Sequence, residues 1–337
     1  MLQKKRAFIT GSAGFIGFHL AELLLQESWE VAGFDGLTDY YDVRLKERRH
    51  EILHQHGTFS STIAQLEDTT SVSESIANFK PDVIVHLAAQ AGVRYSLENP
   101  RAYVDANVVG TLNVMEAARA ANVQHLLMAS TSSVYGANTE MPFDENQKTD
   151  TPLTIYAATK KANEAMGHAW AHIHQIPITM FRFFTVYGPW GRPDMALFKF
   201  TKGILEGTPI DIYNHGEMYR DFTYVADLVR GIRGLMDAVP GRGDAASDTD
   251  NLSPVAPYRV VNIGNSDKVR LLDFIEAIED ELGKKAIRNL MPMQTGDVPA
   301  TWADATMLQD LTGYKPETPF REGVAKFVQW YRDYYEV

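Results

Sequence analysis

The decisive stretch of the sequence is residues 6–17, which read Arg6-Ala7-Phe8-Ile9-Thr10-Gly11-Ser12-Ala13-Gly14-Phe15-Ile16-Gly17. Its apolar first half predicts a buried strand, and the apolar residues that recur after Gly14 predict a helix over 15–26. Gly11 permits a tight turn, and Gly14 lets backbone amides approach a pyrophosphate at the positive end of the helix. Gly17 lets the helix pack close to the sheet. We therefore expect a dinucleotide-binding unit of strand, glycine-rich turn and helix.

Five further apolar runs in the first half of the chain alternate with helical patterns. They lie at Glu30 to Asp35, Thr58 to Ala64, Asp82 to His86, His125 to Ser130 and Ile178 to Phe183. Parallel strands need crossover connections, and the crossovers place helices on both faces of the sheet. The expected fold is therefore α/β, with a Rossmann-like doubly wound parallel sheet.

The pattern loosens beyond about residue 185, which divides the chain into two expected domains. Residues 1–184 are predicted to bind NAD, and residues 185–337 to form a smaller α/β lid that mainly binds substrate. Helices are expected in this second part at Phe198 to Glu206, Val225 to Val239, Leu271 to Leu282 and Phe320 to Tyr334. Residues 240–257 are rich in Asp, Ser, Gly and Pro, so we predict a mobile surface loop there.

The composition narrows the functional classes. The chain contains no cysteine, which excludes disulfides, a thiolate nucleophile and Cys-ligated zinc, and its ten histidines show no metal-ligand spacing, so no metal is expected. A net charge of −11 without a long basic stretch argues against a nucleic-acid partner. The sequence has neither a long apolar run nor a signal-peptide pattern, so we expect a cytoplasmic protein that does not span a membrane.

Asp35 closes the second predicted strand, 18 positions after Gly17. A carboxylate at this place accepts hydrogen bonds from the ribose hydroxyls of the adenosine, and its charge repels a 2′-phosphate. NAD is therefore favoured over NADP. The alternative is that the glycines merely shape a turn, and their position between strand and helix argues against it.

Tyr156 and Lys160 stand four residues apart in a predicted helix, Ile155 to His174, and so share one face. A tyrosine with a pKa near 10 is a poor base, but a nearby lysine cation and the nicotinamide charge stabilise the phenolate and lower that pKa. A surface pair is the alternative, because this spacing occurs by chance on many helices. The predicted strand that ends before Thr131 favours a ligand site, since such sheets bind ligands at their carboxyl edge.

The G-x-x-G-x-x-G spacing resembles that of the extended short-chain dehydrogenase/reductase family, which contains NAD-dependent epimerases and dehydratases. The loop His86 to Gln90 and Asn107 match further motifs of the family, whereas Gly36 and Gln65 stand where relatives carry Asn and Asp. The resemblance implies that NAD is bound by Gly11, Gly14, Phe15, Ile16, Gly17, Asp35, Gln65, Leu66, Leu87, Ala88, Ala89, Gln90, Asn107, Ser130, Tyr156, Lys160, Phe183 and Val186.

The same resemblance implies the chemistry. In this family a hydroxyl residue beside the catalytic tyrosine hydrogen-bonds the reacting sugar oxygen, and Thr131 takes that place, so Thr131, Tyr156 and Lys160 are the expected catalytic residues. Members that dehydrate or decarboxylate carry acidic residues directly after this position, where the chain has Ser132 and Ser133. The implied reaction is reversible oxidation at C4 followed by hydride return to the opposite face, which is epimerisation.

Three segments resemble the UDP-glucuronate 4-epimerases in particular: Asp35 to Asp42, Ala91 to Ser96 and Trp190 to Met195. Oxidation of a glucuronate at C4 makes a β-keto acid, which loses CO₂ when the carboxyl bond lies parallel to the carbonyl π system. A bidentate clamp by Arg192 would prevent that alignment. The hydroxyls of Ser132, Ser133 and Thr185 are expected to assist. The alternative is that Arg192 only pairs with Asp194.

For the nucleotide half, Met218 to Asp227 resembles a family motif that places Arg220 at the UDP pyrophosphate. Lys199 and Phe200 are expected to flank uracil, and Asp297 to reach ribose. The alternatives are a solvated lysine, a core phenylalanine and a turn aspartate. The family also implies a homodimer through the helices around residues 101–120 and 155–174.

Other functions stay open at this point. The nearest are a UDP-glucose or UDP-N-acetylhexosamine 4-epimerase and a UDP-glucuronate decarboxylase. A catalytically silent NAD-binding scaffold represents a different class, because this fold also hosts sensors. The intact set of Thr131, Tyr156 and Lys160 argues against the scaffold.

Overall fold

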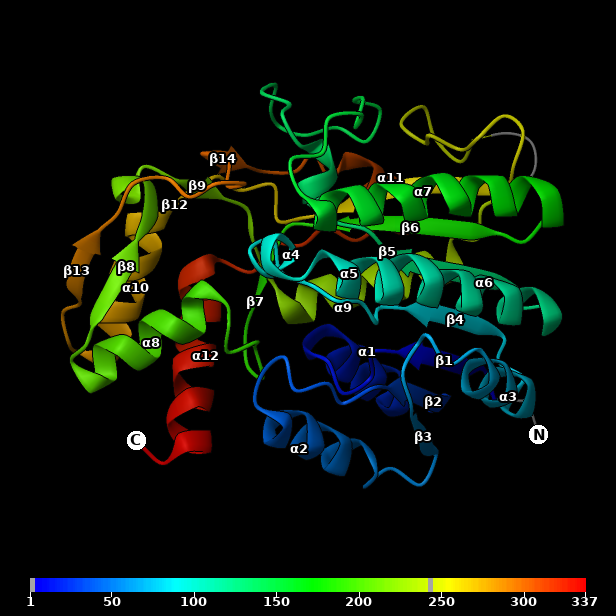
Figure 1. Cartoon of the computed structure of the whole chain (residues 1–337), viewed down its shortest axis with the longest axis horizontal. Coiled ribbons are helices and arrows are strands. Elements are labelled where there is room, and N and C mark those ends of the chain that lie inside the picture. Colours follow the sequence, from blue (N-terminus) through cyan, green and yellow to red (C-terminus); the bar gives the residue numbers. More distant parts are fainter. Residues whose placement is uncertain (1–3, 242–244) are drawn as a thin grey trace.

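The computed structural model describes residues 4–241 and 245–337 and confirms the α/β fold. Its centre is a seven-stranded parallel sheet with the order β11-β6-β5-β4-β1-β2-β3 (Figure 1). The strands are β1 (Arg6–Thr10), β2 (Glu30–Asp35), β3 (Phe59–Ile63), β4 (Val83–His86), β5 (His125–Ala129), β6 (Ile178–Phe183) and β11 (Tyr258–Ile263).

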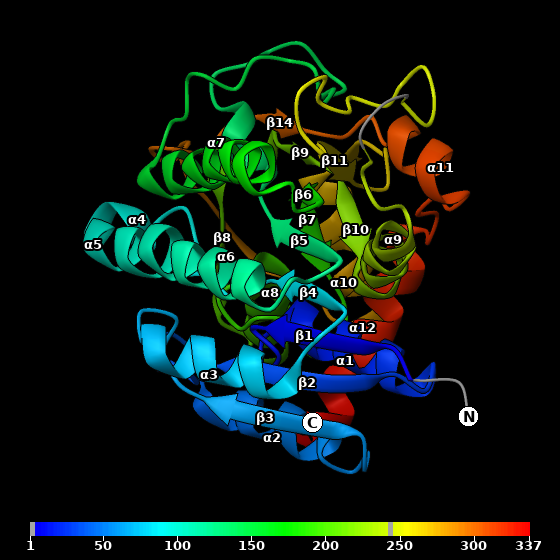
Figure 2. The same ribbon diagram turned by 90° about the vertical axis from the view of Figure 1, so that its right-hand side faces the viewer.

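Helices cover both faces of this sheet (Figure 2). One face packs against α1 (Phe15–Gln26), α9 (Val225–Asp237) and α11 (Thr306–Thr312). The other packs against α3 (Thr69–Phe79), α6 (Gly110–Ala120) and α7 (Ile155–His174). Side chains alternate along each strand, so Ala7 and Ile9 of β1 join the first core and Phe8 joins the second. This two-sided burial explains why the inner strands are nearly continuous apolar runs, whereas the edge strand β3 is more polar and only partly buried.

Further helices and turns follow the strands at the carboxyl edge of the sheet. The helix α2 (Val43–Leu53) follows β2, and α4 (Tyr95–Glu98) and α5 (Pro100–Tyr103) follow β4. A π-helical turn, Val104–Val109, then leads into α6, and a 3₁₀ turn, Ser132–Tyr135, follows β5.

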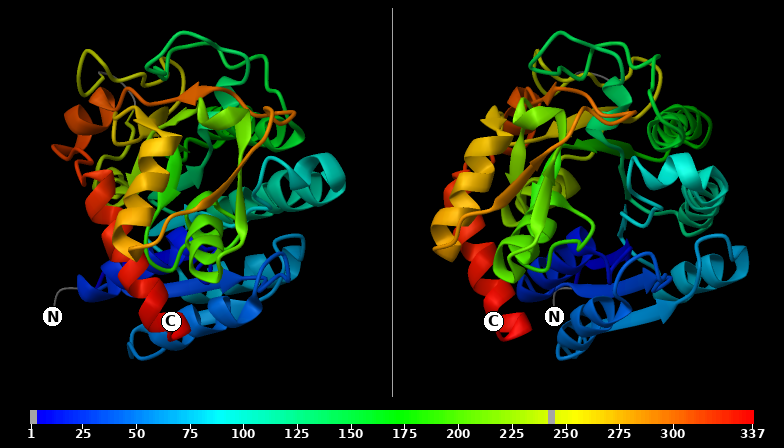
Figure 3. Two further views of the ribbon diagram at one scale, coloured as in Figure 1. Left: turned by 90° about the vertical axis from the view of Figure 1, so that its left-hand side faces the viewer. Right: turned by 60° about the vertical axis from the view of Figure 1, so that its left-hand side comes forward.

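The smaller part of the molecule lies beside the carboxyl edge of the sheet and has its own apolar core (Figure 1). Figure 3 shows its helices α10 (Leu271–Leu282) and α12 (Phe320–Tyr335) side by side. The remaining elements are α8 (Ala196–Glu206) and the short strands β7 (Thr185–Tyr187), β8 (Pro209–Ile212), β9 (Tyr219–Arg220), β10 (Phe222–Tyr224), β12 (Val269–Arg270), β13 (Ile287–Leu290) and β14 (Ala300–Thr301), with a 3₁₀ turn at Tyr213–Gly216.

The second half of the chain also completes the sheet. Strand β11 pairs with β6 in parallel register from Tyr258↔Ile178 to Ile263↔Phe183, and α9 packs on α1. The sheet thus crosses the boundary expected at residue 184, and the assignment of separate cofactor and substrate roles to the two parts stays a prediction. Among the described residues, no helix combines the length and the apolar composition that crossing a membrane requires.

The predicted helices are present, with bounds that differ by two residues or fewer. The predicted loop 240–257 contains no helix or strand in its described part, and residues 242–244 lie outside the described residues. Its backbone is tied to the body of the protein, because Asp250 pairs with Arg259 at 3.1 Å and the Val255 carbonyl meets His172 Nδ1 at 2.8 Å. The mobility of this loop is a prediction that the structure leaves untested.

Candidate active site

A cavity of about 930 Å³ lies between the carboxyl edge of the central sheet and the smaller part of the molecule. Open α/β sheets bind ligands at this edge, and the volume is enough for a dinucleotide-sized or sugar-nucleotide-sized ligand. Every residue predicted as catalytic, cofactor-binding or substrate-binding lines the cavity except Asn107. The cavity therefore brings together residues that the sequence separates by almost 290 positions, from Gly11 to Asp297.

The glycine-rich turn forms one wall of the cavity. Gly11 has φ +76°, and a Cβ there would lie 2.8 Å from the backbone nitrogen of Ala88. A Cβ on Gly17 would lie 2.0 Å from the Gly11 carbonyl oxygen, so helix and turn approach each other as closely as the sequence predicts. The helix α1 begins after Gly14 without a side-chain cap, and Gly14, Phe15 and Ile16 line the cavity. This helix end is suited to a diphosphate.

Asp35 lies at the end of β2 and is 9% exposed. Its Oδ2 accepts the Ala13 N–H and its Oδ1 accepts the Leu37 N–H, both at 2.9 Å. The carboxylate is thus held in place while each oxygen keeps a further lone pair for a ribose hydroxyl. Gln65 donates to the Gly36 carbonyl at 3.1 Å, so the two departures from the family pattern contact each other.

The loop after β4 passes along the cavity. Thr10 Oγ1 accepts the N–H groups of Leu87 and Ala88, both at 3.1 Å. Asn107 is buried behind this loop: its Oδ1 accepts the Gln90 N–H at 2.8 Å and its Nδ2 donates to the Gln90 carbonyl at 3.0 Å. Asn107 therefore supports the wall of the site and is not among the residues that line the cavity, and its predicted contact with the cofactor stays a prediction. Asn107 lies in the π-helical turn Val104–Val109 and is the buried residue of that turn.

Tyr156 and Lys160 lie on the inner face of α7, which begins at Thr154, whose side chain accepts the Ala157 N–H. Burial raises the pKa of Tyr156, while a hydrogen bond from Thr131 and the charge of Arg192 act in the opposite direction. Lys160 is not among the groups that lower this pKa, contrary to the expectation from the sequence. Its Nζ donates to the Ala129 carbonyl at 2.9 Å. Burial lowers the pKa of Lys160 to about 8.

A buried ion pair that the sequence analysis missed lies directly behind these residues. Glu164 accepts two hydrogen bonds from Arg182, from Nε and Nη2, each at 2.9 Å, and a third from the Ser130 hydroxyl at 2.7 Å. Burial alone would raise the pKa of Glu164, but the hydrogen bonds and charge of Arg182 hold it below its usual value. The sequence contains a signal that could have identified Glu164, because this residue follows Tyr156 and Lys160 at the same four-residue interval and so lies on the same helix face.

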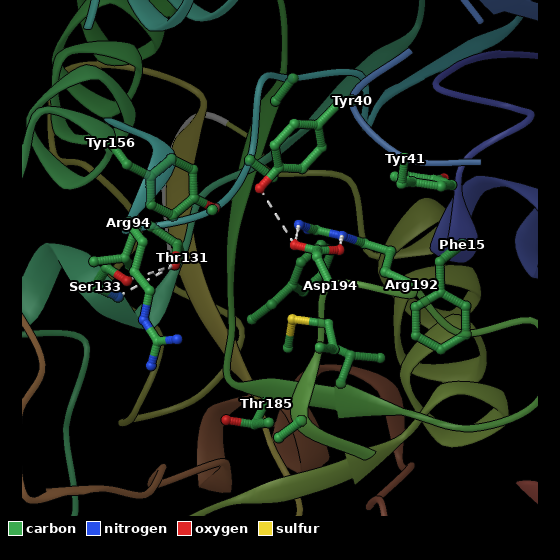
Figure 4. A pocket seen from close by; sticks show the side chains of 18 of the residues that line it. Phe15, Tyr40, Tyr41, Arg94, Thr131, Ser133, Tyr156, Thr185, Arg192 and Asp194 are labelled. Carbon is green, nitrogen blue, oxygen red and sulfur yellow. Dashed lines mark hydrogen bonds and ion pairs between the residues drawn. The ribbon is translucent and has the colours of Figure 1, made fainter. Parts of the chain in front are cut away.

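Arg192 extends along the opposite side of the cavity (Figure 4). Its Nε and Nη2 donate to the two carboxylate oxygens of Asp194 at 3.0 and 2.5 Å, and the Tyr40 hydroxyl donates to the same carboxylate at 3.3 Å. The alternative pairing with Asp194 is therefore observed, and Arg192 still lines the cavity. The charge of Arg192 is one of the influences that lower the pKa of Tyr156.

The far end of the cavity holds the residues expected at the nucleotide. Arg220 Nη2 donates to the Val298 carbonyl at 2.8 Å, and burial lowers the pKa of Arg220 while the charge of Asp297 raises it. Asp297 forms an ion pair with Arg94 at 3.6 Å. The Arg94 guanidinium also lies 4.5 Å from the ring centre of Tyr213. Arg94 lies in a segment that the sequence analysis singled out, but no role was predicted for it.

Ser132, Ser133 and Thr185 also line the cavity, together with Lys199 and Phe200 of α8. Phe200 is 7% exposed and belongs to the apolar core of the smaller part, so most of its surface supports packing. Ser133 donates its N–H to the Thr131 hydroxyl oxygen at 3.2 Å. No carboxylate stands at positions 132 and 133.

This sheet, glycine-rich turn and Thr-Tyr-Lys set define an enzyme of the extended short-chain dehydrogenase/reductase class. The chain belongs to the family described as GDP-mannose 4,6 dehydratase, whose sequence profile matches residues 8–327.

Two curated relatives are similar over nearly the whole chain. A Rhizobium meliloti (strain 1021) protein named "Probable UDP-glucuronate 4-epimerase" is 54% identical over 98% of both chains. The protein CapI of Staphylococcus aureus is 51% identical over 98% of this chain and 99% of its own. Among solved structures, UDP-glucuronic acid 4-epimerase from Bacillus cereus, in complex with UDP-glucuronic acid and NAD, superposes with a TM-score of 0.87 at 30% identity, over 98% of this chain and all of the other.

Proposed function

We propose that this protein is an NAD-dependent UDP-glucuronate 4-epimerase, an isomerase that interconverts UDP-glucuronate and UDP-galacturonate through a 4-keto sugar. One observation supports this proposal most directly. Arg192 and Tyr156 line the same cavity, and the two positions directly after Thr131 carry the hydroxyls of Ser132 and Ser133 and no acid. An anionic sugar fits this arrangement, and a reaction that requires an extra acid or base next to Thr131 does not.

The residues present fit NAD. Three features that suit a dinucleotide line the cavity: the tight turn at Gly11, the uncapped helix end at Gly14 and the hydrogen-bonded carboxylate of Asp35. When bound, NAD supplies the reversible acceptance of hydride from C4 that epimerisation of an unactivated secondary alcohol requires. We propose that residues 1–184 provide most of this cofactor site and that residues 185–337 mainly bind the sugar nucleotide.

Side chains of the protein carry out the transfer of the C4 hydroxyl proton. Tyr156 as phenolate removes the proton of the C4 hydroxyl, and Thr131 hydrogen-bonds both the phenol and the reacting oxygen. Thr131 and Arg192 favour the phenolate, and we propose that Lys160, which stays largely protonated at pH 7 because its pKa is about 8, adds its charge to that of the oxidised nicotinamide when NAD is bound. The same phenol returns the proton once hydride has been delivered to the other face of the ring, and the chain ends each cycle unchanged.

The sugar carboxylate needs its own site, because the 4-keto form of a glucuronate is a β-keto acid. We propose that Arg192 binds this carboxylate in exchange for Asp194, with the hydroxyls of Ser132, Ser133 and Thr185 completing the site. A carboxylate held in this way keeps its C–C bond out of line with the carbonyl π system, which suppresses loss of CO₂. Arg220 would bind the diphosphate, Lys199 and Phe200 the uracil and Asp297 the ribose.

We also propose that the protein acts as a homodimer. Exposed apolar side chains gather on the helices that the family resemblance indicates: Val104 is 40% exposed, Val109 44%, Leu112 36%, Ile155 41% and Ile173 67%. A second copy would bury these side chains. Sedimentation equilibrium tests the proposal, and a monomer at micromolar concentration would contradict it. The cytoplasmic location expected from the sequence stays a prediction.

Incubation of the protein with UDP-glucuronate and NMR of the product tests the activity. UDP-galacturonate is the expected product. A UDP-pentose would indicate a decarboxylase, and no reaction with UDP-glucuronate combined with turnover of UDP-glucose would indicate a neutral-sugar epimerase. Tyr156→Phe should abolish turnover and leave NAD binding nearly intact, and turnover by this variant would exclude the proposed role of the phenol.

A further inference from the structure

The segment that carries Arg192 is anchored on elements of the cofactor-binding unit. Burial lowers the pKa of His19 in α1 to about 4, so its ring is neutral and donates from Nε2 to the Pro189 carbonyl at 2.9 Å. Phe18 of the same helix meets Trp190 edge-on, with ring centres 5.6 Å apart. The predicted substrate-binding arginine therefore follows two residues that are fixed to the helix of the glycine-rich turn.

Arg49 of α2 joins the two segments directly. Its side chain is fully buried, and Nη1 donates to the Ala13 carbonyl at 2.8 Å and to the Tyr41 hydroxyl at 2.9 Å. Nη2 donates to the Trp190 carbonyl at 2.5 Å. One planar guanidinium thus connects the backbone of the glycine-rich turn with the backbone two residues before Arg192.

Both ends of this connection lie in backbone that needs support. Ala13 also donates its N–H to Asp35, so the two peptide units that flank Ala13 are both hydrogen-bonded. Trp190 has φ +60°, a value that residues other than glycine rarely adopt. A Cβ on Gly191 would lie 2.9 Å from the Gly188 carbonyl oxygen. Such a segment keeps its conformation only where surrounding contacts over-determine it, and Arg49 supplies one of these contacts.

The charge of Arg49 has no anionic partner among these contacts. The acceptors that the structure gives it are three carbonyls, of Ala13, Trp190 and Gly191, and the Tyr41 hydroxyl, all of them neutral. Its Nε is buried without an acceptor in the described part of the chain. A buried cation in neutral surroundings favours a nearby anion. Two anions are expected here under the proposed function: the cofactor diphosphate at the turn and the sugar carboxylate at Arg192.

We infer that Arg49 is a specificity-positioning residue that fixes Arg192 in register with the cofactor site. It does not touch the reacting atoms. Through the backbone of Trp190 it determines where the Arg192 guanidinium lies relative to the turn that holds the cofactor. The inference rests on the proposed function, because it assigns the preference for an acidic sugar to a residue outside the substrate site.

The test compares Arg49→Met with Arg48→Met, since Arg48 is the neighbouring exposed arginine of the same helix, paired with Glu51. Calorimetry on NAD-loaded protein gives the Kd of UDP-glucuronate and of UDP-glucose. Arg49→Met should weaken UDP-glucuronate by about tenfold, as expected for one displaced charge-assisted contact, and change UDP-glucose by less than about twofold. Arg48→Met should change neither. Equal losses for both ligands, or no loss, would overturn the inference.

A second variant covers the case in which Arg49→Met does not fold. Arg49→Lys keeps the charge but cannot reach carbonyls on both segments at once. It should also lower the preference for the uronate, and a folded Arg49→Lys protein with the wild-type Kd ratio would overturn the inference. Failure of the proposed function looks different, because in that case the wild-type protein itself neither prefers nor converts UDP-glucuronate.

Discussion

The Ser130 hydroxyl donates to Glu164 at 2.7 Å, and this contact joins the residue that follows β5 to α7, the helix that carries Tyr156. Ser130 directly precedes Thr131, and Glu164 lies one turn beyond Lys160. Arg182 of β6 donates two hydrogen bonds to the same carboxylate. The buried Glu164 carboxylate of α7 is therefore bonded both to β6 and to the residue that follows β5. The geometry of Thr131, Tyr156 and Lys160 depends on this shared contact.

Glu164→Gln should destabilise the protein strongly. The substitution keeps the shape of the side chain but leaves Arg182 buried without its counter-charge, which costs about 3–5 kcal/mol. Chemical denaturation at pH 7 measures the loss. Glu322→Gln is the control, because Glu322 pairs with Lys326 at the surface and its loss should cost less than about 1 kcal/mol. Similar stability of the two variants would show that the buried pair contributes little.

Glu145→Gln should change how stability depends on pH. Burial raises the pKa of Glu145 from 4.5 to about 7, while the Asn262 N–H, which the carboxylate accepts at 2.7 Å, acts against this shift. A raised pKa means that the folded state holds the proton more tightly, so this stabilisation is complete below pH 4.5 and is lost as the pH rises to about 7. The glutamine variant should gain about 1–3 kcal/mol at pH 8 relative to wild type.

Denaturation at pH 5 and pH 8 measures this effect. The difference between wild type and Glu145→Gln should be small at pH 5 and appear at pH 8. Glu140→Gln serves as the control, since Glu140 is an exposed carboxylate in the same loop. A gain of equal size at both pH values would show that the substitution acts by packing and not by removing a buried charge.

Arg192→Met should weaken UDP-glucuronate selectively. Loss of a charged bidentate contact costs about 1.5–3 kcal/mol, or roughly ten- to a hundredfold in Kd, whereas UDP-glucose has no carboxylate to lose. Calorimetry with both ligands measures the ratio. Arg44→Met is the matched control, because Arg44 pairs with Asp42 at the surface. A UDP-pentose among the products of the Arg192 variant would further support the role in retaining CO₂, and unchanged affinity would leave Arg192 as the partner of Asp194 alone.

Gly17→Ala should abolish retention of NAD. The added Cβ would lie 2.0 Å from the Gly11 carbonyl oxygen, so α1 and the glycine-rich turn must separate, at a cost of about 1–3 kcal/mol or more. Absorbance of the bound dinucleotide and thermal unfolding report the two effects. Gly57→Ala is the control, because a Cβ there has no atom within 4 Å. If Gly17→Ala bound NAD like the control, the close packing of turn and helix would be unimportant for the site.

Local sequence signals predict six of the seven strands of the central sheet and the helices α1 and α7, whereas the seventh strand, β11, was not predicted. Most of these strands are buried on both faces, and Thr154 caps the start of α7, so apolar runs and capping residues are useful signals there; the edge strand β3 is only partly buried. Strands β7, β9, β10, β12 and β14 are two or three residues long, too short for any periodicity to reveal them.

The site residues that the sequence analysis missed share one physical property. Arg49 and Arg94 have partners far away in the sequence, at Ala13 and at Asp297, and Glu164 has its partners on other elements, at Ser130 after β5 and at Arg182 in β6. A charged residue in a helical pattern looks like part of a solvated face until the fold brings such partners to it. Asn107 is a different case. A motif identifies the residue in the sequence, but only the fold shows that its side chain hydrogen-bonds the backbone of Gln90.

The outer position of β11 has a consequence for biosynthesis. This strand is made only after much of the smaller part has been translated, and until residues 258–263 leave the ribosome the hydrogen-bonding edge of β6 stays open. The sheet is then completed late, and prematurely terminated chains expose the unpaired backbone groups of β6, with which a strand of another chain can pair. Shortened versions made for expression should therefore keep β11, even when only the dinucleotide-binding unit is wanted.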